Sequence, residues 1–523
     1  TTLLEQPTNI TSQTPSIVSS NVPSTNDTEK LSSKVLPNET DIQKNTAIST
    51  EKSKSQSTIL SVNDAIKNSI VKIYTVSNIP KYRTPWNSNT SSATGSGSII
   101  QGNRILTNAH VIANSTFIQV KRFGETKRYE AKVVDVSHAA DLALLEVSDP
   151  SFFEGAIPLS FGELPQIQQE VLVYGFPTGG GGMSVTKGVV SRIEYQRYAH
   201  SGELLLAVQV DAAINSGNSG GPVMSKGKQI GVVMQKRTRA ENIGYMVPMP
   251  VIQHFLTDLA DKKQDGFPGL GIQTQTMENP FSKKKYLVPE GQTGILVYRV
   301  DYNSPAKGDI QVNDVITAID GHNITDTEEV EYRPNEYLSY WYYVDQKQIG
   351  DEVTFDVLRQ GVAKRVTIKL TDSYKQYRLV PYEQYDKQPT YVIFGGLVFM
   401  PLTTNYLLES AWNSELIYQP ATLEKQEVVV LTQVLADSVN RGYHDLNDVI
   451  VEKINGQSFK NMKEFYQILM QSKDDYLVFS DDMGYQVVIN RNASIEKNPS
   501  ILQRYGIPKS QSDDLSPLIQ QGQ

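Results

Sequence analysis

Ser219 lies in the Gly-rich segment Asn215–Pro222, whose composition suits a nucleophile turn. A serine hydroxyl attacks a carbonyl only when a neighbouring base removes its proton and when backbone N–H groups converge on the developing oxyanion. Gly217 permits the backbone angle that turns an N–H inward, while Gly220 and Gly221 leave room for a substrate. The alternative interpretation is a β-hairpin turn without chemistry. The segment predicts a serine nucleophile whose base must come from elsewhere in the chain.

The base is sought among the histidines, because histidine is the side chain that most often accepts a proton near neutral pH. The chain contains His110, His138, His200, His254, His322 and His444. His110 ends the segment Leu106–His110, where an apolar strand runs into a turn, and a barrel presents side chains to a cleft at such turns. The other five stand in polar loops, on an expected helix or in later modules. The sequence favours His110 as the general base.

A third group must hold the imidazole in the correct tautomer and stabilise the imidazolium. Asp141 opens the apolar run Leu142–Val147, and a carboxylate at the mouth of a buried strand is costly unless it is paired. Asp135, Asp149 and Asp211 are rivals, but none heads so continuous an apolar run. The long gaps between these residues mean that spacing alone does not prove a triad.

Composition excludes several kinds of function. Lysine plus arginine number 49 and aspartate plus glutamate 57, which gives a formal net charge of −8. No long basic stripe interrupts this balance, which argues against a nucleic-acid partner. No run approaches the roughly 18 apolar residues of a membrane span. Zero cysteines exclude disulfides and thiolate chemistry. Since the chain starts at Thr1, we also expect that a targeting segment has been removed.

The sequence predicts neither a cofactor nor a metal. Gly179–Gly182 resembles a phosphate-binding loop only in its glycines, because no Gly-Lys-Ser/Thr follows it. There is no His-Glu-x-x-His zinc motif and no EF-hand loop. Any hydrolysis would therefore rely on side chains alone.

Residues 1–58 are rich in Ser, Thr, Asn, Gln and Pro, so they cannot bury enough apolar surface to offset the entropy of ordering. From Val62 onward, short apolar runs alternate with turn residues; Ile70–Val76 and Leu204–Val210 are two of them. Strands at this spacing indicate an all-β barrel or sandwich. A helical pattern over Val251–Lys262 closes this domain.

The second half of the chain contains an internal echo. Asn313–Gly321 recurs as Asn447–Gly456 with one extra residue. We expect a helix after each copy, over Asn335–Tyr343 and over Met462–Met470, followed by strands. Two copies of one small module are the economical explanation.

These patterns predict a mainly β chain of successive domains. We expect a disordered polar leader at 1–58, a β-barrel domain at 59–264, a first α+β module at 266–372, a Tyr-rich linker at 373–390, a second module at 391–498 and a loose C-terminal tail at 499–523.

Three blocks together resemble the active-site motifs of the HtrA/Deg serine proteases: Thr107–His110, Asp141–Leu145 and Asp211–Pro222. Further blocks resemble the plant-type Deg branch, namely Leu270–Ile272, Tyr391–Phe399 and Val430–Asp437. This resemblance implies a trypsin-like double β-barrel protease domain at 59–264. It implies that the two later modules are PDZ domains.

The resemblance also implies roles for individual residues. Ser219 would attack the peptide carbonyl, His110 would take and return the proton, and Asp141 would orient His110. The N–H groups of Gly217 and Ser219 would form the oxyanion hole. The substrate pocket would be built partly by Ile243, Gly244, Tyr245 and Met246, with a small-to-medium aliphatic preference. Peptide binding by the first PDZ domain would use Leu270, Gly271 and Ile272, which take a carboxylate. For the second, Phe394–Leu397 is the candidate, and an internal partner stays open.

The function so implied is that of an ATP-independent serine endopeptidase that degrades unfolded or damaged proteins. The family implies a homo-oligomer, a trimer or a multiple of trimers, and Tyr82 and Trp86 are candidates for its contacts. A bacterial periplasm or cell envelope is the expected compartment, with a plant-type organelle as the alternative. The rival function is a peptide-binding chaperone or scaffold whose protease is silent.

Overall fold

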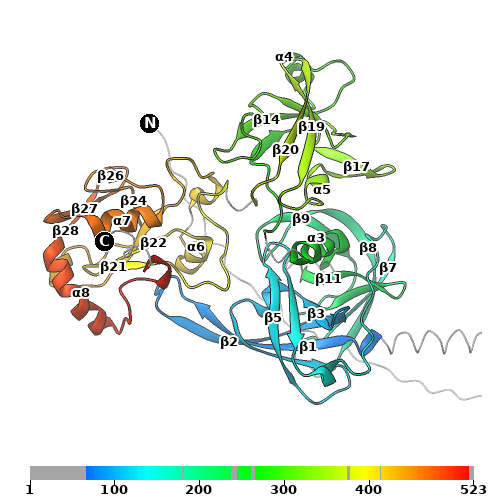
Figure 1. Cartoon of the computed structure of the whole chain (residues 1–523), viewed down its shortest axis with the longest axis horizontal. Helices are drawn as coiled ribbons and strands as arrows, with labels where there is room; N and C mark the ends of the chain where they lie inside the picture. Colours follow the sequence, from blue (N-terminus) through cyan, green and yellow to red (C-terminus); the bar gives the residue numbers. More distant parts are fainter. Residues whose placement is uncertain are drawn as a thin grey trace, which may run out of the picture. The chain divides into compact units, whose positions relative to one another are not determined.

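The computed structural model of the chain describes residues 66–178, 182–236, 244–260, 265–373, 377–412 and 414–516. The leader predicted for 1–58 lies outside these residues. Figure 1 shows the whole chain and labels many of the helices and strands named below.

The first of two barrels closes in the strand order β1-β2-β3-β6-β5-β4. Its strands are β1 (Ile70–Pro80), β2 (Ser88–Ile100), β3 (Arg104–Thr107), β4 (Ser115–Arg122), β5 (Tyr129–Ser137) and β6 (Leu142–Val147). Side chains alternate between the two faces of a strand, so Val71 and Ile73 of β1 meet Val120 of β4 in the barrel core. The short helix α2 (Ala109–Ile112) follows β3 directly. A Cβ on Gly95 of β2 would lie 2.5 Å from Val111 Cγ1, so only glycine lets β2 pass this helix.

The second barrel closes in the order β10-β11-β12-β9-β8-β7. Its strands are β7 (Glu170–Gly175), β8 (Ser184–Arg197), β9 (Leu204–Val210), β10 (Pro222–Ser225), β11 (Lys228–Lys236) and β12 (Gly244–Pro248). The predicted closing helix is α3 (Met249–Ala260), which buries Val251, Ile252 and Phe255 in the barrel core. The predicted trypsin-like double barrel is confirmed.

The first PDZ module is a sheet with its own apolar core. It contains β13 (Ile272–Gln275), α4 (Pro280–Lys285), β14 (Ile295–Val300), β15 (Val315–Ile319), β16 (His322–Asn323), β17 (Glu329–Arg333), β18 (Glu336–Ser339), α5 (Trp341–Val344), β19 (Glu352–Arg359) and β20 (Val362–Lys369). The helix predicted over Asn335–Tyr343 is wrong for most of its length, and only its last three residues, 341–343, lie in the short helix α5. β17 and β18 form a hairpin, because Asn335 adopts a left-handed φ of 61° and turns the chain back.

The second PDZ module consists of two four-stranded sheets, β21-β22-β23-β24 and β26-β25-β27-β28. Its elements are β21 (Val392–Phe394), β22 (Leu397–Pro401), α6 (Thr404–Ser410), β23 (Val429–Val434), β24 (Val449–Val451), β25 (Lys453–Ile454), β26 (Gln457–Ser458), α7 (Met462–Gln471), β27 (Tyr476–Ser480), β28 (Gln486–Asn490) and α8 (Arg491–Tyr505). The predicted second helix is confirmed as α7, which Asn461 caps at its first turn.

The loose tail predicted from residue 499 is wrong as far as the structure describes the chain, to residue 516. α8 continues to Tyr505 and ends on Gly506 with a left-handed φ of 66°. Ile501 and Ile507 are buried in a core shared with the second PDZ module. This segment is polar overall, so the sequence analysis did not recognise the few widely spaced apolar residues that pack it against the second PDZ module.

Candidate active site

His110 and Asp141 form a hydrogen-bonded pair at the end of the first barrel. The Nδ1 atom of His110 lies 2.8 Å from Asp141 Oδ2 and 3.0 Å from Oδ1. The backbone N–H of His110 donates to Oδ1 at 2.9 Å. Asp141 is 1% exposed, so its carboxylate accepts hydrogen bonds from His110 rather than from water. The structure therefore brings the predicted base and the predicted acid together.

Local backbone geometry holds this pair in place. His110 is the second residue of α2, directly after β3, and Asp141 directly precedes β6, which pairs with β3. The Asn108 side chain donates to the Asp141 carbonyl at 2.8 Å. Asp141 has a left-handed φ of 54°, which a non-glycine residue adopts only where its surroundings enforce it. Asn108 is a supporting residue to which the sequence analysis gave no role.

The electrostatics of the pair suit a base. Burial alone would lower the pKa of His110, but the charge of Asp141 and its hydrogen bond to Nδ1 outweigh burial, so the pKa of His110 is raised. A carboxylate only accepts hydrogen bonds, so Nδ1 carries the proton of the neutral ring. Nε2 is then left as the acceptor.

Ser219 reaches the first barrel through its backbone. The Ser96 N–H donates to the Ser219 carbonyl at 2.9 Å. A Cβ on the next residue, Gly220, would lie 2.2 Å from both Ser96 O and Thr107 Oγ1. The serine turn thus sits against the end of β3, and α2 with His110 follows that end after a single residue.

Two carbonyl groups of the serine turn, those of Ser216 and Asn218, accept hydrogen bonds from nearby residues. Thr178 donates to the Ser216 carbonyl from its N–H at 2.7 Å and from its hydroxyl at 2.9 Å. The Gly221 N–H donates to the Asn218 carbonyl at 2.9 Å. Across a trans peptide the carbonyl and the following N–H point in opposite directions. The N–H groups of Gly217 and Ser219 therefore point away from these partners, with Gly217 at a left-handed φ of 95°.

Ser96 is a site residue that the sequence analysis missed. Its hydroxyl donates to the Gly217 carbonyl at 2.7 Å and accepts from the Phe176 N–H at 2.8 Å. The side chain is fully buried and joins the first barrel to two segments of the second. The only signal in the sequence was its position between two glycines, Gly95 and Gly97.

The other acidic candidates lie apart from His110. Asp149 pairs with Lys127 at 3.0 Å, and Asp135 Oδ1 accepts from the Val136 N–H. Asp211 is exposed, and its N–H donates to Val189. His138 and His200 do lie near His110, and His254, His322 and His444 do not contact it in the described structure.

The predicted pocket segment is only partly described, because Ile243 lies outside the described residues. Gly244 begins β12, and a Cβ there would lie 2.1 Å from Ile214 Cδ1, so it abuts the segment before the serine turn. Tyr245 is buried and donates to Glu194 at 3.0 Å, and Met246 is also in the barrel core.

The predicted peptide-binding residues of the first PDZ module precede its outer strand. Leu270 and Ile272 are buried in the module core, and Gly271 between them has a left-handed φ of 59°. Among the described strands, β13 is the outermost of its sheet and pairs only with β14.

The corresponding turn of the second PDZ module is filled by the chain itself. Gly395 and Gly396 form the two-residue turn between β21 and β22. The Gly395 N–H donates to Asn498 Oδ1 of α8 at 3.1 Å, and the Asn440 side chain donates to the Gly395 carbonyl at 2.8 Å. The structure gives this turn an internal partner, which the sequence analysis had left open.

The aromatic residues expected at subunit contacts have partners within the chain. Tyr82 is 4% exposed in a core shared with the second PDZ module. Trp86 packs edge-on against Tyr391 with ring centroids 6.0 Å apart. The structure therefore uses both rings inside one chain.

The described residues offer neither a membrane-spanning helix nor a cluster of metal ligands. They contain no helix that is both long and apolar enough to cross a membrane. Their acidic and histidine side chains nowhere gather in a group of three that could hold a metal ion.

Family comparisons match three regions of the chain. A trypsin-like peptidase domain matches residues 95–232, and PDZ domains match residues 268–370 and 380–514. Fold and site thus define a trypsin-like serine peptidase with two PDZ domains.

Relatives in Arabidopsis thaliana share most of this chain. Putative protease Do-like 3, mitochondrial, is 37% identical over 459 residues, which cover 87% of this chain and 82% of the relative. Protease Do-like 2, chloroplastic, is 39% identical over 460 residues, covering 86% and 75%. The solved HtrA-type protease AlgW with decapeptide is 22% identical with a TM-score of 0.46, covering 59% of this chain and 97% of that one. The chain belongs to the Do-like (Deg) family of HtrA-type serine proteases and is a serine endopeptidase.

Proposed function

We propose that His110, Asp141 and Ser219 act as one catalytic triad that degrades unfolded or damaged proteins without ATP. The observation that carries this proposal is the hydrogen-bonded His110–Asp141 pair, with its buried carboxylate, at the barrel end on which the Ser219 turn is seated. The Ser219 hydroxyl attacks the peptide carbonyl while His110 Nε2 takes its proton and later returns it to the leaving amine. Asp141 keeps the proton on Nδ1 and stabilises the imidazolium.

The N–H groups of Gly217 and Ser219 would stabilise the oxyanion. Support comes from the bonds that hold the Ser216 and Asn218 carbonyls on the opposite side of their peptide planes. Donors fixed before the reaction need no reorganisation when charge develops, and loss of one such donor typically costs roughly 10²–10³ in turnover.

The segment 243–246 would form part of the pocket for the residue before the cut. The contact between Gly244 and Ile214 gives this region an apolar wall, which favours a small-to-medium aliphatic side chain. The first PDZ module would capture an extended peptide through Leu270–Ile272 and the outer edge of β13.

Unfolded casein incubated without nucleotide tests this function. We expect wild-type protein to degrade casein, and Ser219→Ala to lose more than about 10⁴ in turnover while still binding it. Ser92→Ala is the matched control, because this serine is exposed on β2. Casein that is bound but never cut by wild type would support the peptide-binding scaffold instead.

The pH profile of kcat/KM supplies a second test. His110 must be neutral to act as a base, and its pKa is raised above 6.5. The rate should therefore rise with pH through an apparent pKa above 6.5. In Asp141→Asn the charge that raises the pKa of His110 is lost, whereas burial, which lowers this pKa, remains. The increase of residual activity with pH should therefore begin at a lower pH than in the wild type. A wild-type profile that is already flat at pH 6.5 contradicts this assignment.

Compartment and assembly are further parts of the proposal. The relatives named mitochondrial or chloroplastic favour an organelle over the periplasm that composition first suggested. We expect a trimer or a multiple of it in solution, and light scattering after size exclusion measures this directly.

A further inference from the structure

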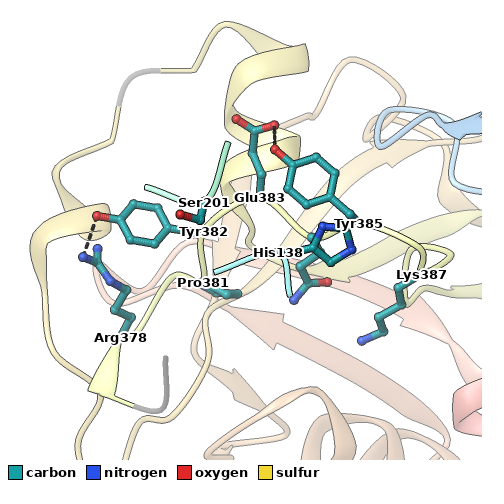
Figure 2. A pocket seen from close by; sticks show the side chains of 9 residues that line it. His138, Ser201, Arg378, Pro381, Tyr382, Glu383, Tyr385 and Lys387 are labelled. Carbon is teal, nitrogen blue, oxygen red and sulfur yellow. Dashed lines mark hydrogen bonds between the residues drawn. The ribbon is translucent and has the colours of Figure 1, made fainter. Parts of the chain in front are cut away.

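Residues 381–387, here called the strap, precede β21 within the region that the second PDZ domain matches, yet they lie against the peptidase barrels. Within the strap, the Tyr385 hydroxyl lies 3.0 Å from a Glu383 carboxylate oxygen, and Arg378, just before the strap, donates to the Tyr382 hydroxyl at 2.5 Å (Figure 2). A cavity of about 340 Å³ separates part of the strap from His138 and Ser201. Contact with the barrels is therefore concentrated in a few side chains.

Asp386 makes the most specific of these contacts. Its Oδ1 accepts from the Asn114 N–H at 2.5 Å, and its own N–H donates to Asn114 Oδ1 at 2.8 Å. Both residues have a left-handed φ of 55°. Such a backbone is uncommon outside glycine, and asparagine and aspartate tolerate it best. This reciprocal pair fixes the strap two residues after α2, the helix that carries His110.

The second Asp386 oxygen holds the turn that leads to Asp141. Its Oδ2 lies 2.8 Å from His138 Nε2. His138 opens that turn, because its carbonyl accepts from the Asp141 N–H at 3.3 Å. One carboxylate thus reaches both backbone segments that present the His110–Asp141 pair.

An aromatic stack continues the link to the catalytic ring. The Tyr385 ring stacks on His200 with centroids 3.9 Å apart, and its hydroxyl donates to the His200 carbonyl at 2.8 Å. His200 Nε2 lies 2.9 Å from His138 Nδ1, and its ring centroid lies 6.1 Å from that of His110. Burial lowers the pKa of His200 to about 4, so this ring is neutral at physiological pH and places no positive charge beside His110.

We propose that Asp386 is a positioning residue of the peptidase: by holding Asn114 and His138, it fixes the segments that carry His110 and Asp141. The proposal rests on the triad proposed above. It makes turnover depend on a segment outside the two barrels, which precedes β21 in the region matched by the second PDZ domain.

Exposure separates this role from ordinary packing. The Asp386 side chain is 39% exposed, and exposed ion pairs add little to stability. A purely structural contact of this kind would leave both stability and turnover nearly unchanged. A positioning contact would lower turnover while the unfolding midpoint barely moves, because a small displacement of catalytic groups can cost about 10²-fold in rate.

Three variants test the proposal on the full chain. Asp386→Ala removes the side-chain contacts with Asn114 and with His138. Asp386→Asn keeps the hydrogen bonds with Asn114 but loses the carboxylate that faces His138. Lys387→Ala is the control, because this exposed strap residue reaches neither His138 nor Asn114 through a bond that the structure shows. The assays are kcat and KM on a peptide substrate, and the pH dependence of Ser219 labelling by a small fluorophosphonate.

We expect kcat to fall about 10–100-fold in Asp386→Ala with KM little changed. Asp386→Asn should recover part of the loss, and the labelling profile should shift along the pH axis in the same order. Equal kcat and equal profiles in Asp386→Ala and Lys387→Ala would overturn the proposal. So would a loss in Asp386→Ala that is matched by a lower unfolding midpoint and not recovered by Asp386→Asn.

A readout that needs no turnover keeps the two proposals apart. The proton between His110 Nδ1 and Asp141 gives a downfield NMR signal, which should weaken or move in Asp386→Ala but not in Lys387→Ala. If the wild type shows this signal and never labels at Ser219, the triad fails while the positioning role is still measured. If the signal is identical in all variants, the positioning role fails whatever the activity.

Discussion

The two PDZ modules share a sequence echo but differ in what lies at the outer edge of their sheets. In the first, β13 is the outermost described strand and only β14 pairs with it. In the second, the outer edge of β21 is paired by the C-terminal segment. The Ile393 N–H donates to the Ser510 carbonyl at 2.6 Å, and the Ser512 N–H donates to the Tyr391 carbonyl at 3.0 Å.

This difference indicates that the first module can bind a peptide at its edge strand, whereas the same edge of the second module is covered by its own chain. A PDZ domain binds by adding an extended peptide to such an edge. In the second module an antiparallel bridge between Val392 and Gln511 already joins this edge to the chain's own C-terminal segment, and Asn498 of α8 bonds the glycine turn. The first module is therefore the one expected to capture substrate.

Ser512→Pro should have the largest effect on this contrast. Proline fits the φ of −70° at this position but removes the N–H that donates to Tyr391 and the hydroxyl that accepts from it. We expect a loss of about 2–3 kcal/mol in unfolding free energy and faster hydrogen exchange in β21. Ser512→Ala keeps the N–H and should lose less. A synthetic peptide of residues 507–516 should bind only the proline variant, and unchanged exchange in β21 would refute the pairing.

Gly271→Ala should affect the first module alone. The left-handed φ of 59° disfavours alanine, and its Cβ would lie 2.7 Å from Ser304 Cβ. We expect a loss of about 1–2 kcal/mol and at least about tenfold weaker peptide binding by fluorescence anisotropy. Gly291→Ala is the matched control, because this glycine also has a positive φ but open space around it. Equal affinity in both variants would remove Leu270–Ile272 from the binding site.

Asp345→Asn should give the smallest effect, at the contact between the first module and the second barrel. Tyr195 donates to this carboxyl at 2.7 Å, and burial raises the pKa of Asp345 to about 7. The folded state then holds a proton that the unfolded state has lost, so stability falls as pH rises between about 4 and 7. In Asp345→Asn, stability should no longer fall over this pH range. The difference in unfolding midpoint, variant minus wild type, should therefore be about 2–4 °C larger at pH 8 than at pH 5. Parallel pH profiles of the two midpoints would contradict the assignment.

The His110–Asp141 pair could be predicted from sequence because the chemistry of a general base restricts the choice. Only six histidines were available, and Asp141 headed a buried strand, where an unpaired charge is costly. The barrels followed from short apolar runs at strand spacing. The catalytic roles of His110, Asp141 and Ser219, and the roles of Gly217 and of the pocket, stay predictions.

What could not be predicted depends on contacts between distant residues. Ser96 meets Gly217 across 121 positions, and Asp386 meets His138 across 248. Local composition carries no record of such contacts. The ordered C-terminal segment was missed for the same reason, because Ile501 and Ile507 read as isolated residues until the second module surrounds them.

The Ser96 hydroxyl ties the two barrels together at the peptide plane of Gly217. A chain in which only one barrel has folded lacks either the acceptor or the donor of that bond, as well as either the serine or its base. Newly made copies are therefore inert toward one another during synthesis, when each is itself an unfolded polypeptide.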